Sequence, residues 1–173
     1  MVDLDGNDYD GFVFMYNTGR SLEMNSTNTS VGGYAASELA PKIETLYTNL
    51  ADADLKASIK EVTITCNDGY ANSNAKHEYV AHMFLASSKE VGFNFSRYQY
   101  AAEGSIFDYF SAGTDTVRAN FARSNVANIS SNWWLRSACS ALDETFYFVA
   151  TNGNYGLNNA NTSYVVVAAF VIG

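Results

Sequence analysis

The spacing of apolar residues changes along the chain from a helical period to a strand period. Between Ser37 and Leu50, apolar side chains recur every three or four residues, which predicts an amphipathic helix. Pro41 is compatible with this helix because it falls in the first turn. A second short helix is predicted directly afterwards, with Asp52 or Asp54 as its N-terminal cap. The pattern therefore puts the helices early in the chain.

After these helices the pattern favours short strands joined by long polar segments. Val62, Ile64 and Cys66 alternate with threonines, which predicts a half-buried strand. Continuous apolar runs predict further strands at residues 11–16, 83–86, 133–135, 146–149 and 165–172. Residues 106–110 are predicted to form either a short strand or a helical turn. Residues 24–33, 67–76 and 151–163 are predicted to be loops, and residues 113–131 show no clear period. Helices followed by short strands predict an α+β domain rather than a series of βαβ units.

Composition narrows the class of protein. The 173 residues suit one domain. Charged residues make up 16% of the chain, against roughly a quarter in a typical soluble domain, so Asn, Ser, Thr and Tyr supply much of the polar surface. The net charge of −8 argues against a nucleic-acid partner, because neutralising phosphates requires a basic face. An aromatic content of 14% excludes general disorder, although residues 1–11 are expected to be poorly ordered.

No targeting or membrane-spanning segment is expected. The acidic start Met1–Asp5 lacks the apolar core of a signal peptide. The longest apolar run, Val165–Ile172, is too short to cross a bilayer. Cys66 and Cys139 each stand beside apolar or small residues, so we predict two buried free thiols.

No arrangement of residues points to catalysis or to a metal. His77 and His82 are the only histidines, and their spacing differs by one residue from the His-Glu-x-x-His zinc motif. Ordinary surface and strand-edge histidines are the simpler interpretation. The chain also lacks a Gly-x-Ser-x-Gly elbow and a phosphate-binding loop. The sequence therefore predicts neither an enzyme nor a bound cofactor or metal.

The strongest local signal is the segment Asn132–Ala138, which contains Trp133, Trp134 and Arg136. Adjacent residues of a strand point to opposite faces, so at least one tryptophan should lie in the core. Arg136 should pack against a ring or donate to backbone carbonyls. All three residues are interpreted as scaffold.

The order of several motifs resembles a family of bacterial and phage domains. The motifs are Trp133–Ala138, Phe146–Val149, Asn152–Asn154, Asn158–Ala160 and Ala169–Ile172. Upstream, the segments 24–29, 32–37, 53–62, 84–91 and 103–110 are similar to the same family. The family includes variable proteins with a C-type lectin fold that retroelements diversify. The resemblance implies a single lectin-like domain over residues 1–173, with two helices followed by short antiparallel strands and long loops.

Two features depart from that family: its ending, and the one or two strands that the family often has before the position of Gly11, where this chain is short. The usual ending of the family, Gly-Val-Arg-Pro-Ala-Phe, is replaced here by Val165–Phe170, which lacks the Gly, the Arg and the Pro. The chain also lacks the Trp-Asn-Asp triplet and the Glu-Pro-Asn or Gln-Pro-Asp loop that calcium-dependent sugar binding would need. Calcium-dependent carbohydrate recognition is therefore not carried over.

In the diversified members, adenine replacement makes Asn codons hot spots, and the altered positions lie between the tryptophan strand and the final strand. The resemblance implies a candidate variable region at residues 132–173. Its candidate ligand-binding positions are Leu142, Asp143, Glu144, Thr145, Phe148, Ala150, Asn154, Tyr155, Gly156, Leu157, Asn158, Asn159, Asn161, Thr162 and Tyr164. Tyr, Asn and Gly in such a segment also suit a binding face, because they combine rigid contact area with adaptable hydrogen bonding.

The resemblance thus implies a non-enzymatic protein that presents a diversified patch to a macromolecular ligand, expected to be a protein. It also implies a location at a cell surface or on a phage particle, and it leaves the oligomeric state open. One alternative is a structural or adhesive surface domain of a bacterium or phage with fixed loops. Another is an enzyme related to the formylglycine-generating branch of the lectin fold, which would need Cys66 and Cys139 to react in one cleft.

Overall fold

A computed structural model describes residues 11–69, 76–93, 103–111, 116–126 and 130–173. The predicted α+β class is confirmed, since a few short helices accompany strands in two sheets. The helical elements are η1 (Tyr34–Ala36), α1 (Leu39–Thr48), α2 (Ala53–Ser58), η2 (Asp108–Phe110) and α3 (Thr116–Ser124). The strands are β1 (Phe12–Leu22), β2 (Ile59–Lys60), β3 (Val62–Asn67), β4 (Lys76–Ala81), β5 (Trp133–Ala138), β6 (Thr145–Val149), β7 (Tyr155–Asn159) and β8 (Tyr164–Ile172).

The larger sheet joins the two ends of the described chain. Its strand order is β1-β8-β5-β6-β7, and β2 pairs with β8 off this path. β1 runs antiparallel to β8 from Phe12↔Ile172 to Leu22↔Tyr164, whereas β5 meets β8 in parallel at Trp133↔Val165. β3 and β4 form a separate antiparallel pair. The closing of β8 between β1 and β5 is a long-range pairing that local sequence patterns do not reveal.

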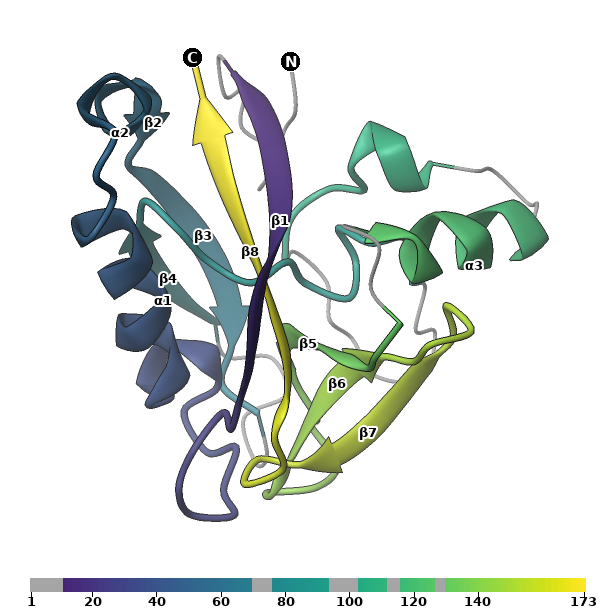
Figure 1. Ribbon diagram of the computed structural model, residues 1–173. Coiled ribbons are helices and arrows are strands. Elements are labelled where there is room, and N and C mark those ends of the chain that lie inside the picture. Colours follow the sequence, from purple (N-terminus) through teal and green to yellow (C-terminus); the bar gives the residue numbers. More distant parts are fainter. Residues whose placement is uncertain (1–10, 70–75, 94–102, 112–115, 127–129) are drawn as a thin grey trace.

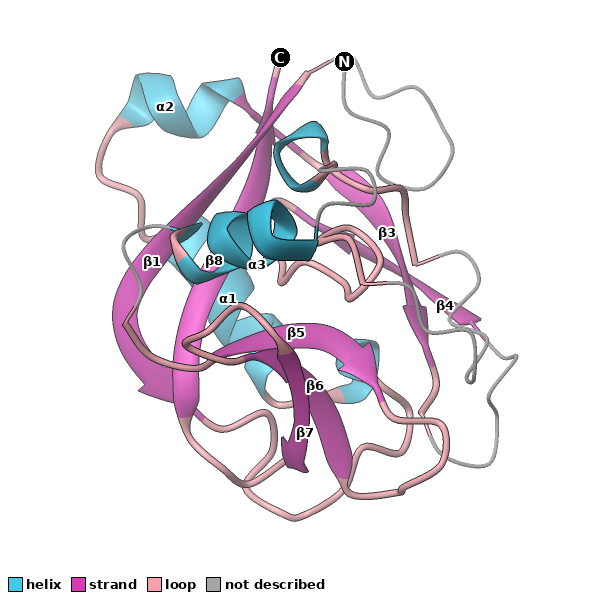
Figure 2. Cartoon of the chain, turned by 90° about the vertical axis from the view of Figure 1, so that its right-hand side faces the viewer, coloured by secondary structure: helices cyan, strands magenta, loops and turns pink. Residues whose placement is uncertain are grey.

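The helices flank the β1–β8 pair on opposite sides. Figure 1 shows α1 and α2 on one side of this pair and α3 on the other. In the view of Figure 2, α3 lies in front of the sheet, and the β6–β7 hairpin lies at the end of the molecule opposite to the end of β8. The hairpin is therefore set apart from the two early helices.

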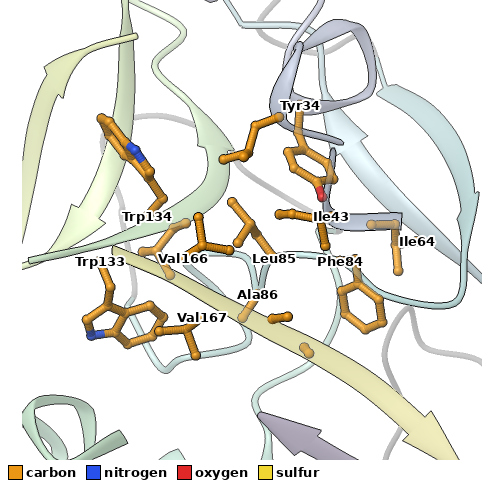
Figure 3. Close-up of a cluster of buried hydrophobic side chains, with 14 of the residues drawn as sticks. Tyr34, Ile43, Ile64, Phe84, Leu85, Ala86, Trp133, Trp134, Val166 and Val167 are labelled. Carbon is orange, nitrogen blue, oxygen red and sulfur yellow. The ribbon is translucent and has the colours of Figure 1, made fainter. Parts of the chain in front are cut away.

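The core is built around β5, the strand at the middle of the sheet. All six of its residues are buried, because both faces of the strand are covered. Figure 3 shows the rings of Trp133 and Trp134 on opposite sides of β5, near Leu85, Val166 and other apolar side chains. The prediction that at least one tryptophan is core is confirmed, and both of them are.

Several predicted elements are confirmed. The first helix begins at Leu39 with Pro41 in its first turn. Asp52 caps the second helix, its carboxylate accepting from the backbone N–H groups of Asp54 and Leu55 at 3.0 and 2.9 Å. The predicted strands at 11–16, 62–66, 133–135, 146–149 and 165–172 correspond to β1, β3, β5, β6 and β8. Cys66 and Cys139 are buried free thiols, as expected.

The predicted strand at 83–86 is wrong: it reduces to a single bridge between Phe84 and Ala169. The backbone carbonyls of Leu85 and Ala86 instead accept hydrogen bonds from Arg136. The backbone N–H of Arg136 donates to Ala86 at 2.9 Å, and its guanidinium donates to the Leu85 carbonyl at 3.0 Å. An apolar run thus lies in the core without forming a ladder.

Five of the described elements were not predicted: η1, β2, β4, α3 and β7. β4 is mostly exposed, and β7 contains Gly156 and asparagines, so neither has an apolar pattern of its own. Residues 106–110 contain a 3₁₀ turn, η2, which is one of the two alternatives predicted for them. The expectations for residues 1–10, 70–75 and 94–102 lie outside the described residues.

Candidate binding face

One of the predicted scaffold residues, Trp134, lies beneath part of the candidate face. The Trp134 indole N–H donates to the Leu22 carbonyl at 2.9 Å, which ties β5 to the end of β1. The same ring lies 4.7 Å from the Tyr164 ring and 6.4 Å from the Phe148 ring, centroid to centroid. Trp134 therefore supports two of the candidate positions from beneath.

Arg136 is fully buried and links β5 to three distant segments. Its guanidinium donates to both carboxylate oxygens of Glu90, at 2.5 and 2.7 Å, and to the carbonyls of Thr65, Leu85 and Glu103. Burial disfavours its charge, but the charge and hydrogen bond of Glu90, together with smaller effects that include Glu103, raise the pKa of Arg136 above its ordinary value. The predicted contacts to carbonyls are confirmed.

The acidic partners of Arg136 were not predicted from the sequence. Glu90 ends a polar stretch that follows the apolar run 83–86, and Glu103 follows a segment rich in aromatic residues. The Glu103 carboxylate accepts from the backbone N–H of Asn67 at 3.0 Å and from the Ser137 hydroxyl at 2.5 Å. Burial raises the pKa of Glu103, although Arg136 acts in the opposite direction. A signal that could have pointed to them is Arg136 itself, because an arginine inside an apolar strand requires a counter-charge when it is buried.

The β6–β7 hairpin divides the candidate positions between two faces. Residues alternate along a strand, and Phe148 pairs with Gly156 while Tyr147 pairs with Leu157. One face therefore carries Phe148 and Gly156, and the opposite face carries Leu157. The candidate positions of this hairpin do not form one continuous patch.

The first face is half-buried and tightly packed. The Phe148 and Tyr164 rings lie 4.7 Å apart, and the Asn158 amide donates to the Tyr164 hydroxyl at 2.6 Å. A methyl group added at Gly156 would run into the Phe148 ring. A substitution at Phe148, Gly156, Asn158 or Tyr164 therefore disturbs the packing of its neighbours in this group.

The second face exposes apolar side chains. Tyr155 is 54% exposed and Leu157 is 37% exposed. The Tyr155 ring makes an edge contact with Phe93 at 5.4 Å and a tilted contact with the buried Tyr147 at 6.1 Å. These contacts fix the direction of Tyr155 while leaving its outer surface accessible.

The segment between β5 and β6 carries a further group of candidates. Leu142 is 45% exposed, and Asp143 is also exposed. The backbone here is held by the early polar loop: Ser30 N–H donates to the Asp143 carbonyl at 2.7 Å, and the Asn28 amide donates to Glu144 at 2.9 Å. Thr145 differs from Leu142 and Asp143 in being buried, because it begins a strand whose residues are almost all covered.

The turn between β6 and β7 is docked on α3. The Asn120 amide donates to the Asn154 side chain at 3.1 Å, and Arg123 donates to the Gly153 carbonyl at 2.7 Å. Arg123 also lies over the Phe93 ring at 4.1 Å. Ala150, which precedes this turn, is half-buried. The unpredicted helix α3 thus positions one end of the candidate face.

The candidate positions fall into three classes of exposure, and Thr145 alone is buried. Those exposed to solvent are Leu142, Asp143, Asn154, Tyr155, Leu157 and Asn161. Those half-buried are Glu144, Phe148, Ala150, Gly156, Asn158, Asn159, Thr162 and Tyr164. Only the first class can vary with little effect on neighbouring side chains.

The two histidines face different carboxylates. His77 Nε2 lies 3.1 Å from Asp68 Oδ1, and His82 Nδ1 lies 2.7 Å from Glu44 Oε1 while stacked on Tyr47. Within the described ranges, no three side chains of the kinds that usually bind metals gather in one place. None of the helices described there has the length and apolar character needed to cross a membrane.

Comparison with known families gives one match. The model of a family described as a domain of unknown function (DUF6273) matches residues 13–173. The chain belongs to this family. The match runs from β1 to the C-terminal residue, so it covers the scaffold and the candidate face together. No curated protein and no solved structure matches the chain.

Proposed function

We propose that the protein is a non-enzymatic binding module in which a lectin-like scaffold presents a diversified patch to a macromolecular ligand. The observation that carries the proposal is the contrast within one sheet: β5 is wholly buried, whereas Tyr155 and Leu157 expose apolar side chains two strands away. Rigid aromatic contact area beside Asn and Gly is the composition of antibody-like binding loops. The order of two helices followed by mainly antiparallel strands supports the lectin-like assignment.

The proposal restricts diversification to the exposed positions Leu142, Asp143, Asn154, Tyr155, Leu157 and Asn161. Replacing an exposed side chain usually changes the free energy of unfolding by less than about 0.5 kcal/mol. Random replacement at Thr145 or Phe148 would instead leave cavities or unsatisfied polar groups, since the first is buried and the second packs on Tyr164. A binding face that must tolerate many different sequences therefore has to be made of these exposed positions.

Sequencing the encoding locus in related strains tests the diversification. We expect a neighbouring reverse-transcriptase gene and a near-identical template repeat that differs at adenines. Differences between copies should gather at the exposed set and spare Trp134 and Thr145, which serve as internal controls. Lack of the gene and the repeat would remove the diversification and leave a binding surface of fixed sequence.

A surface domain with fixed loops is the second candidate, favoured by contacts that join candidate positions to the scaffold. Asn28 donates to Glu144, and Asn158 donates to Tyr164, so both positions are constrained by hydrogen bonds. If the loops are fixed, related strains should carry identical residues at all fifteen candidate ligand-binding positions. The cysteine enzyme has less support, because neither Cys66 nor Cys139 is open to solvent.

Tolerance can be measured directly on the protein. A triple variant Leu142→Asn, Tyr155→Asn, Leu157→Asn should fold and lose little thermal stability, because all three side chains are exposed. The matched variant Thr145→Asn, Phe148→Asn, Tyr164→Asn should lose much more. Equal losses in the two variants would contradict a patch built to vary.

A further inference from the structure

The outer edge of β1 is a strand edge without a partner in the described part of the chain. β1 is the terminal strand of the sheet order, and its register with β8 is regular from Phe12 to Asn17. Beyond Asn17 the register shifts, and Gly19 has a positive φ of 70°, so the strand bends there. An edge strand leaves every second backbone N–H and C=O group available to another strand. The regular stretch Phe12–Asn17 is therefore long enough to pair with an added strand.

A groove of about 450 Å³ follows this edge. Its lining combines Phe12–Met15 of β1, Phe107–Phe110 at η2, and Asn125 and Val126 after α3. Successive strand residues point to opposite faces, so a groove that touches four in a row runs along the strand edge. Figure 1 shows α3 on the side of β1 away from α1 and α2. The groove thus lies where an added strand would run.

The side chains along the groove are apolar and partly exposed. Phe12 is 67% exposed and Tyr109 is 65% exposed. Phe14 is also exposed, and its ring stacks on Phe170 at 5.8 Å, which fixes its direction. Aromatic side chains that stay exposed while held in place suit contact with apolar side chains of a partner.

Charge indicates which partner fits. Among the described residues that line the groove, Asp108 is the charged one. The chain carries a net charge of −8, so a second copy would meet both a like-charged groove and a like-charged molecule. A partner segment that contains lysine or arginine is attracted both by Asp108 and by the negative charge of the chain as a whole.

We propose that the edge of β1 over Phe12–Asn17 binds an extended segment of a basic partner protein. The segment adds a strand antiparallel or parallel to β1, places alternate apolar side chains in the groove, and brings a Lys or Arg to Asp108. This mode of recognition takes affinity from main-chain hydrogen bonds and specificity from the pockets beside them. The site lies at the opposite edge of the sheet from β7, and it does not depend on the proposed function of the candidate binding face.

The probe for this proposal is a random library of displayed nine-residue peptides, selected on the full chain. We expect the enriched peptides to alternate apolar residues and to contain Lys or Arg. Their dissociation constants for the protein and its variants are then measured with synthetic, labelled peptides.

Charge and steric variants locate the site. Asp108→Lys should weaken the selected peptides on the order of tenfold because it puts like charges together. Phe12→Lys should weaken them by a similar factor because apolar contact is lost and the edge becomes charged. Glu78→Lys and Val80→Lys on β4 make the same changes at exposed positions of the other sheet, and should leave binding unchanged. Circular dichroism and thermal unfolding check that all four variants fold.

A second measurement distinguishes strand addition from simple occupation of the groove. N-methylation of alternate peptide amides should weaken binding by about threefold for each hydrogen bond lost, whereas methylation of the intervening amides should have little effect. Equal effects in both registers would rule out an added strand.

Three results would overturn the proposal. The first is that no peptide is enriched over a blank surface. The second is that Asp108→Lys and Phe12→Lys leave the selected peptides bound as tightly as before. The third is a dimer in sedimentation equilibrium that Phe12→Lys dissociates, since a second copy would then occupy the edge.

Discussion

β5 and β7 belong to one sheet and are separated only by β6, yet they are stabilised in different ways. β5 is buried along its whole length and carries a bidentate ion pair between Arg136 and Glu90. β7 exposes Tyr155 and Leu157, and it is held by hairpin pairing and by contacts of its turn with α3. A single strand, β6, thus separates the buried strand β5 from the more exposed strand β7. Substitutions in β5 should therefore lower the free energy of unfolding far more than substitutions at the exposed positions of β7.

The largest effect is expected at the buried ion pair. Arg136→Met leaves the Glu90 carboxylate buried without its partner, which should lower the free energy of unfolding by about 3–5 kcal/mol. The double variant Arg136→Met, Glu90→Leu should recover part of this loss, because neither charge is then buried alone. Urea denaturation of both variants checks the comparison. A loss below about 1 kcal/mol in the single variant would mean that the pair contributes little.

The next effect concerns the turn that joins β6 to β7. Gly153 has a positive φ of 79°, and a methyl group there would collide with the Asn120 carbonyl of α3. Gly19 has a similar φ with nothing near it, so it is a matched control. Gly19→Ala should cost about 1–2 kcal/mol, and Gly153→Ala about 1–3 kcal/mol more. Equal losses would show that the turn is not docked on α3.

A smaller effect concerns the pH dependence of stability. Burial raises the pKa of Glu103, so the folded protein retains this proton at a higher pH than the unfolded chain does. The contribution of Glu103 to the free energy of unfolding should therefore fall as pH rises from about 4.3, the ordinary value of a glutamate, through the raised pKa.

The variant Glu103→Gln isolates this contribution. Its stability relative to the original protein should increase over that pH range and level off above it, as measured by urea denaturation at several pH values. A difference that stays constant with pH, or decreases, would contradict the raised pKa.

The smallest effect is expected on the exposed face. Tyr155→Ala should cost about 0.5–1 kcal/mol, because the ring touches Phe93 and Tyr147 but is half exposed. Trp134→Ala is the buried counterpart and should cost about 3–5 kcal/mol. Thermal unfolding of the two variants compares the faces. A loss at Tyr155 as large as at Trp134 would make this tyrosine part of the core.

Elements with their own apolar pattern could be predicted from the sequence. The helix from Leu39 has a repeating apolar face, and β3 alternates Val62, Ile64 and Cys66 with threonines. α3 could not be predicted because its sequence has no clear apolar period, and a contact that positions it, Arg123 with the Gly153 carbonyl, joins residues far apart in the chain. β7 could not be predicted because its residues gain a strand conformation only by pairing with β6.

The candidate face was predictable as a stretch of sequence but not as a surface. Residues 142–164 contain the expected Asn, Gly and Tyr, yet alternation in the hairpin sends Phe148 and Leu157 to opposite faces. Thr145 is buried although its neighbours Leu142 and Asp143 are exposed. Exposure depends on which elements cover a position, and that information is not local.

By itself, the sequence determined the α+β class, the early helices, the buried tryptophan strand and the free buried cysteines, because periodicity and side-chain size act locally. Tertiary contacts alone set which charges meet Arg136, which candidate positions face solvent, and which strands end the larger sheet within the described residues. These features depend on contacts between residues far apart in the chain, such as Glu90 with Arg136 and β1 with β8. Such contacts have no periodic trace in the sequence, since they arise only when the whole chain packs.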